Sequence, residues 1–174
     1  MVDDALRVVD EMHQRAWSLL KGALGDVNDE EIDWRPLPQA NSINVIVRHL
    51  RIEAEWHLAS LARGDPMPSD VTPSLQEEID AVPLDFRRNL DALEQLYIAF
   101  LDALRSTTLN RLQQRTAAAY GDAAQASGSA YLLGYHQAMH LTMHCGQIRT
   151  IRNLYRTTRG EPAKFFPDNP TYPR

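Results

Sequence analysis

Four long stretches of the chain repeat apolar residues at the three- and four-residue spacing of an amphipathic helix. The first runs from about residue 3 to 24, and the second from Asn41 and Ser42, two good helix N-caps, to about 62. The third is regular from Phe86 to about 106, because Pro83 interrupts an earlier start at residue 75. The fourth covers about 129–155. This pattern predicts an all-α protein folded as a four-helix bundle.

The connecting segments give weaker signals. Residues 107–129 are small and polar and allow no clear assignment, whereas the end of the chain is rich in proline, which excludes a long helix there. We therefore predict one bundle domain over residues 1–160 and an extended Pro-rich tail over residues 161–174.

Length and composition narrow the class of protein. A chain of 174 residues with a net charge of −5 fits one domain, and its acidic balance argues against a nucleic-acid partner. A single cysteine excludes an intrachain disulfide framework and a cysteine-based metal cluster. The acidic start of the chain and the lack of a long apolar run predict a cytoplasmic protein with no membrane segment.

Two ionisable side chains on the second helix are predicted to point into the bundle. Successive helical residues turn by about 100°, which groups Asn44, Arg48, Arg51 and Glu55 on one side that we expect to face water. His49 and Glu53 project from the opposite side, one turn apart. An inward histidine and carboxylate need partners, because an unpaired buried polar group costs several kcal/mol.

The fourth helix carries three histidines, at positions 136, 140 and 144, on the side opposite a predicted solvent-facing stripe of Arg149, Arg152 and Arg156. Met143, Gln147, Ile151 and Leu154 share the histidine side. His136 and His144 lie about 12 Å apart along the axis, too far to share one ion. The spacing therefore leaves two pairs open, His136 with His140 or His140 with His144, and His49 would complete either as a third ligand.

This donor set restricts the chemistry. Three imidazoles favour Zn²⁺, Ni²⁺, Fe²⁺ or Cu²⁺, and three protein ligands with open positions are typical of a catalytic centre. A ferritin-like di-iron centre is excluded because the fourth helix has no acidic residue. The alternative is a polar core network without metal, in which His13 and His57 are ordinary buried histidines.

The sequence also resembles a known family. The segments Trp34-Arg35-Pro36, Asn41-Ser42-Ile43, His49-Leu50 and Glu53, followed by His140-x-x-x-His144-x-Gly146-Gln147, are similar to the DinB/YfiT-like superfamily of four-helix bundles. The resemblance implies a metal triad of His49, His140 and His144, with Glu53 and His136 as assisting residues. Cys145 stands where many relatives carry a basic residue, on what we expect to be the outer face.

The resemblance implies an activity class rather than a substrate. Relatives include thiol S-transferases and a mycothiol-dependent isomerase, so the leading hypothesis is a divalent-metal enzyme, with Zn or Ni favoured over Fe. It would transfer a low-molecular-weight thiol to a small electrophilic substrate, with Glu53 or His136 assisting proton transfer. The alternatives are a metal-dependent hydrolase and a non-catalytic metal- or ligand-binding stress-response bundle. Relatives commonly form homodimers, and the arginine stripe is interpreted as a solvated face.

Overall fold

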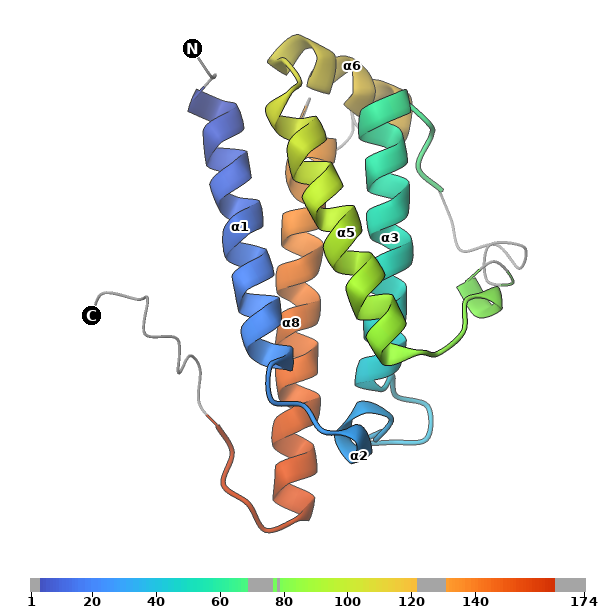
Figure 1. Ribbon diagram of the computed structural model, residues 1–174, viewed down its shortest axis with the longest axis vertical. Coiled ribbons are helices and arrows are strands. Elements are labelled where there is room, and N and C mark those ends of the chain that lie inside the picture. Colours follow the sequence, from blue (N-terminus) through green and yellow to red (C-terminus); the bar gives the residue numbers. More distant parts are fainter. Residues whose placement is uncertain (1–3, 69–76, 78, 122–130, 165–174) are drawn as a thin grey trace.

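The protein is all-helical in the part of the chain that the computed structural model describes, residues 4–68, 77, 79–121 and 131–164 (Figure 1). This confirms the predicted all-α class. The predicted extended tail falls largely on residues 165–174, which lie outside the described residues. Among the described helices, none is long and apolar enough to cross a membrane.

Four long helices lie side by side along the long axis of the molecule: α1 (Asp4–Leu24), α3 (Ile43–Arg63), α5 (Phe86–Arg105) and α8 (Leu132–Thr158) (Figure 1). Their bounds agree with the four predicted stretches to within a few residues. Helices α1 and α8 run in one direction and α3 and α5 in the other, and α3 packs against both α5 and α8. The antiparallel pairing of α3 with α8 brings the histidines of the two helices opposite each other.

Local capping explains where these helices begin and end. The Ser42 hydroxyl accepts a hydrogen bond from the backbone N–H of Val45 at 3.3 Å, which satisfies a free donor in the first turn of α3. Asp85 caps α5 in the same way through the N–H of Arg88 at 3.0 Å. Helix α3 ends at Gly64, whose φ of 85° lies in the left-handed region that favours glycine.

Among the described residues, at least two shorter helices were not predicted. Helix α2 (Asp29–Ile32) is a single turn after α1, and α6 (Leu109–Tyr120) lies across one end of the long helices (Figure 1). Helix α6 buries three side chains on one face: Leu112, Thr116 and Ala119. The ambiguous segment 107–129 therefore contains an amphipathic helix. The last residue of this helix, Tyr120, lies among the histidines described below.

The predicted solvent-facing arginine stripe is wrong for Arg152. Its side chain is buried and forms ion pairs with Glu31 at 2.8 Å and with Asp26 at 2.7 Å. These acidic residues come from α2 and from the turn after α1, so the arginine joins α8 to the segment between α1 and α3. The pairing explains how a guanidinium can occupy a buried position, since buried charges require partners.

Several other orientations also differ from the helical arithmetic. Met143 and Leu154, predicted on the core side of α8, are 54% and 45% exposed. Asn44, predicted to face water, is buried because its amide donates to Asp33 at 2.9 Å. Cys145 is also buried rather than on the outer face, and its thiol donates to the carbonyl of Leu19 at 3.4 Å. At Asn44 and Cys145, a neighbouring segment that periodicity does not reveal covers the position.

Candidate metal centre

Three histidines from α3 and α8 converge on one point. The Nε2 atom of His140 lies 3.1 Å from Nε2 of His49 and 2.9 Å from Nε2 of His144. One ring nitrogen from each of the three residues lies within 4.8 Å of the others, a group that can hold a metal ion. His140 and His144 stand one turn apart on α8, and His49 reaches them from the antiparallel helix. We call this group the His49 trio.

The surroundings of the three imidazoles favour the neutral form that metal binding requires. Burial lowers the pKa of His49 to about 4 and that of His140 to about 3, and the nearby histidines lower both further. Burial also lowers the pKa of His144, although its hydrogen bond to Gln147 acts in the opposite direction. A neutral imidazole has one ring nitrogen with a free lone pair, so each of the three rings can offer one nitrogen to a metal ion.

The side chains of Gln147 and Glu53 lie next to the ring nitrogens of the trio that face away from its centre. The side-chain oxygen of Gln147 accepts a hydrogen bond from Nδ1 of His144 at 2.7 Å, which assigns the hydrogen of that imidazole to Nδ1 and frees Nε2. The Glu53 carboxylate lies 3.8 Å from Nδ1 of His140. Burial raises the pKa of Glu53, which brings this carboxyl group closer to the range of a general base near neutral pH.

His136 does not join the trio, although spacing alone allowed it to pair with His140. Its Nδ1 atom instead lies 2.8 Å from the Tyr120 hydroxyl and 3.2 Å from Nε2 of His57. Nδ1 of His57 lies 2.7 Å from the backbone carbonyl of Glu53. We call His57, Tyr120 and His136 the Tyr120 cluster. His57 was predicted to be an ordinary core histidine and Tyr120 was not singled out.

His13 is the one histidine outside both groups. It is fully buried, its Nε2 lies 2.6 Å from the carbonyl of Gly134, and its ring packs against Phe100. Burial lowers its pKa, in spite of the opposing effects of that hydrogen bond and of Asp10. Its Nδ1 atom is buried without a hydrogen-bond partner among the described residues, so only one of the two ring nitrogens is satisfied within the core.

The sequence model of the DinB superfamily matches residues 12–148, which include α3, the loop before it and the histidines of α8. The chain belongs to the DinB superfamily. No curated protein and no solved structure matches it. The matched range contains every residue of the His49 trio and of the Tyr120 cluster.

A cavity of about 600 Å³ in this DinB-superfamily protein lies near the trio, although none of the three histidines lines it. Gln147 belongs to both, because it lines the cavity and hydrogen-bonds to His144. The other walls of the cavity come mainly from α8, from the first turns of α3 and from the loop before α3: Pro36, Ala40, Asn41, Ile46, Met143, Gly146, Thr150 and Ile151. The exposure of Met143 thus has a structural reason, since the side chain borders this cavity.

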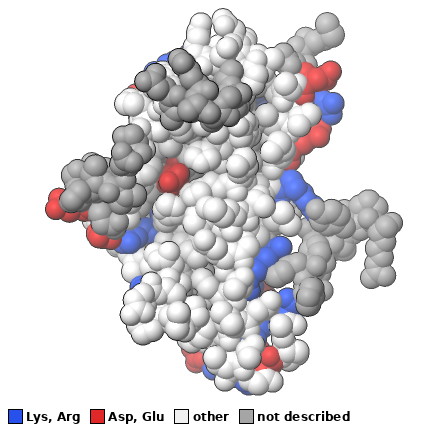
Figure 2. Space-filling model, turned by 180° about the vertical axis from the view of Figure 1, so that it is seen from behind, with Lys and Arg blue, Asp and Glu red and all other residues white. Residues whose placement is uncertain are grey.

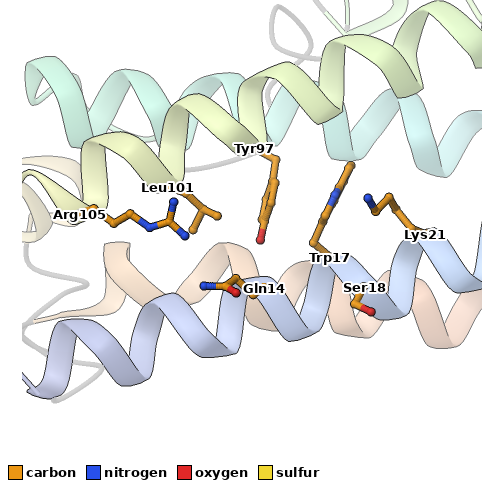
Figure 3. A pocket seen from close by; sticks show the side chains of 7 residues that line it. All are labelled: Gln14, Trp17, Ser18, Lys21, Tyr97, Leu101 and Arg105. Atoms are coloured by element: carbon orange, nitrogen blue, oxygen red, sulfur yellow. The ribbon is translucent and has the colours of Figure 1, made fainter. Parts of the chain in front are cut away.

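Two further hollows of the DinB-superfamily protein lie away from the histidines. One, of about 420 Å³, lies between α1 and α5, where the rings of Trp17 and Tyr97 stack at 4.6 Å (Figure 3). No histidine, cysteine or carboxylate lines it. The other, of about 720 Å³, lies between α1 and α8 and is mostly apolar, with Met12 and Met139 in its walls.

On the face opposite that of Figure 1, charged side chains lie mostly toward the edges and the middle of the visible surface is largely uncharged (Figure 2). Sequence reasoning missed Tyr120, and it also missed that Gln147 links His144 with the cavity. Gln147 has a signal, its place three residues after His144 on the same helix face, whereas nothing in the sequence links Tyr120 to the histidines.

Proposed function

We propose that this protein is a divalent-metal-dependent enzyme in which His49, His140 and His144 hold the ion. The single observation that supports the proposal is the convergence of three neutral imidazole nitrogens, with separations of 3.1 and 2.9 Å to the central His140. Three nitrogen ligands fit Zn²⁺ and Ni²⁺ and also fit Fe²⁺, and they leave coordination positions open for water or substrate.

A bound divalent ion would supply Lewis acidity, which lowers the pKa of a thiol or water toward neutrality. The residues of the chain provide the rest. Gln147 fixes the tautomer and orientation of His144. Glu53 accepts the proton that the nucleophile loses through one intervening water, because its carboxylate lies beside Nδ1 of His140, on the side of the ring away from the other two histidines. It suits this role better than His136, whose Nδ1 already contacts Tyr120 and His57.

We propose thiol transfer as the reaction, on the strength of the family resemblance. The sulfur of a low-molecular-weight thiol forms a bond to an electrophilic carbon of a small substrate, the leaving group departs with its electron pair, and the thiol proton passes to Glu53. The cavity beside Gln147 supports this assignment, because Ile46, Met143 and Ile151 would accommodate the apolar body of such a substrate. Hydrolysis, with water in place of the thiol, is the alternative reaction.

The non-enzymatic alternative is a bundle that binds a metal ion or a ligand without catalysing a reaction. Such a site is expected to be closed by a fourth protein ligand. In the described part of the chain, the group around His140 has three ligand residues, and a cavity lies near it. Both features favour the enzyme.

We further propose a four-helix bundle with a single domain over 1–160, a cytoplasmic location and a homodimeric state, with no nucleic-acid partner.

The activity test compares the protein loaded with Zn²⁺ or Ni²⁺ with the same protein after chelation. Each sample is assayed with low-molecular-weight thiols and an electrophilic aryl halide, and separately with a nitrophenyl ester. We expect metal-dependent consumption of thiol that falls by roughly 10²–10⁴-fold in Glu53→Gln. Glu55→Gln is the matched control, because Glu55 is exposed and pairs with Arg51. Equal rates with and without metal would contradict the proposal, and metal-dependent ester cleavage alone would identify the hydrolase.

A further inference from the structure

The side-chain amide of Gln147 uses its oxygen within the protein and leaves its NH₂ group free. The oxygen accepts a hydrogen bond from Nδ1 of His144 at 2.7 Å, which identifies the other end of the amide as the NH₂ group with its two donors. Within the described part of the chain, this NH₂ group has no acceptor. Gln147 is exposed and lines the cavity of about 600 Å³, so the two donors are available to a molecule that binds there.

Two other polar side chains line this cavity, those of Asn41 and Thr150. The Thr150 hydroxyl donates its hydrogen to the backbone carbonyl of Gly146 at 3.0 Å, so it has no hydrogen left for a ligand. Asn41 comes from the segment before α3, and no hydrogen bond among the described residues joins it to the His49 trio. Gln147 is therefore the donor of the cavity wall that also contacts a residue of the trio.

The walls of the cavity carry no charged side chain, and apart from the three polar residues they are apolar or glycine. Arg35 contacts a wall residue without lining the cavity, because its Nη1 donates to the backbone carbonyl of Ala40 at 3.0 Å. A charged ligand would give up part of its hydration here without finding an opposite charge in the wall, which is costly. The cavity therefore fits an uncharged molecule.

We propose that the cavity binds an uncharged molecule with an apolar body and a carbonyl oxygen, and that the NH₂ group of Gln147 donates to this oxygen. The inference rests on the proposed function, since it names the class of the electrophilic substrate. The apolar body packs against Ile46, Met143 and Ile151. The carbonyl oxygen satisfies a donor of the wall, as a polar group in an apolar cavity must.

This contact places the carbonyl group on the side of the cavity next to the trio. Because one amide contacts both His144 and the ligand, the carbonyl oxygen lies two hydrogen bonds away from an imidazole of the trio. A hydrogen bond to the carbonyl oxygen also withdraws electron density from the adjacent carbon and stabilises negative charge that develops on the oxygen. Gln147 thus both binds this class of substrate and makes it more electrophilic.

The test is the binding of three probes with one benzene ring each: acetophenone, ethylbenzene, which lacks the carbonyl oxygen, and benzoate, which is charged. Each is titrated into the full chain in excess Zn²⁺, and binding is followed through the amide NMR signals of Gly146 and Ile151. We expect the ratio of the acetophenone affinity to the ethylbenzene affinity to fall about fivefold in Gln147→Leu, the effect of one neutral hydrogen bond. Benzoate is expected to bind the wild type at least about tenfold more weakly than acetophenone.

Asn41→Ala and Thr150→Ala are the matched controls, because they remove the other polar side chains of the same wall and should leave the affinity ratio unchanged. The proposal is overturned if acetophenone does not bind, if Gln147→Leu keeps the wild-type ratio, or if Asn41→Ala lowers the ratio as much. Benzoate that binds as tightly as acetophenone would also overturn it and would assign ligand selection to Arg35. No turnover is measured, so an inactive protein that binds acetophenone as expected would contradict the proposed reaction alone.

Discussion

His144 donates a hydrogen bond from Nδ1 to the side-chain oxygen of Gln147, at 2.7 Å and three residues away on α8. The bond holds the imidazole in the tautomer whose Nε2 lone pair faces His140. Gln147 thereby connects the His49 trio with the cavity of about 600 Å³ that it lines. We therefore expect the Gln147 amide to influence the affinity of the trio for a metal ion without being a ligand.

Replacing Gln147 therefore changes the affinity for metal. We expect Gln147→Leu to weaken Zn²⁺ binding by about 10–100-fold, because the tautomer and the ring orientation of His144 are no longer fixed. Gln147→Glu keeps an acceptor oxygen and should retain the affinity. Chelator competition measures both variants. Thr150→Ala, one turn further along the same cavity wall, is the control. Equal affinities for Gln147→Leu and Gln147→Glu would contradict this role.

The buried ion pair between Arg152 and Glu31 makes a second prediction, about stability. The side chains are 9% and 3% exposed, with Nε and Oε1 2.8 Å apart. Arg152→Met leaves the Glu31 carboxylate buried without its main partner, so we expect a loss of about 3–5 kcal/mol in the free energy of unfolding. Urea denaturation followed by circular dichroism measures the change.

Two further variants distinguish the loss of this ion pair from the general effect of removing a charge. The double replacement Glu31→Met with Arg152→Met should recover most of the stability, since no buried charge is then left unpaired. Arg159→Met removes a half-exposed partner of Glu30 and should change stability by about 1 kcal/mol or less. A single Arg152→Met variant as stable as Arg159→Met would show that Glu31 does not depend on the guanidinium.

The stability of the chelated protein should fall in mild acid. Burial lowers the pKa of all six histidines, to about 4 for His49 and His57, whereas the unfolded chain has the ordinary value near 6.5. Below that value the unfolded state binds more protons, so the free energy of unfolding decreases as the pH falls from about 7 toward 4. Glu53, whose pKa is raised, acts in the opposite direction but is a single group.

Urea midpoints at pH 7.5, 6.0 and 5.0 measure this dependence. One histidine whose pKa is lowered by folding contributes a slope of at most about 1.4 kcal/mol per pH unit. The His13→Gln variant lacks one such histidine and should show a shallower dependence than the wild type. A midpoint that stays constant or rises between pH 7.5 and 5.0 would mean that the histidines are charged in the folded protein.

The sequence predicts the four long helices because their apolar spacing and caps are local properties. It leaves α6 unassigned, although Leu112, Thr116 and Ala119 follow a helical spacing, because the segment is otherwise small and polar. Arg152 was misplaced for a different reason. Its position on α8 is that of a solvated residue, and only the distant Asp26 and Glu31 make its burial favourable.

For the histidines too, the sequence predicts local properties but not contacts between helices. Spacing on α8 identifies His136, His140 and His144 as one inward series, but it does not say which pair acts together. The answer depends on Tyr120, which approaches His136 from α6, and on His49, which approaches His140 from α3. Both contacts join two different helices, so periodicity within one helix contains no information about them.

Metal content in His140→Ala tests the central claim most directly, because His140 is the middle residue of the trio. The wild type, His140→Ala and the control Thr142→Ala, an exposed residue on the same helix, are loaded with Zn²⁺, gel-filtered and analysed for metal per chain. We predict that His140→Ala binds one equivalent fewer than the wild type and that Thr142→Ala binds the same amount. An unchanged metal content in a folded His140→Ala protein would contradict the assignment of the His49 trio as a metal centre.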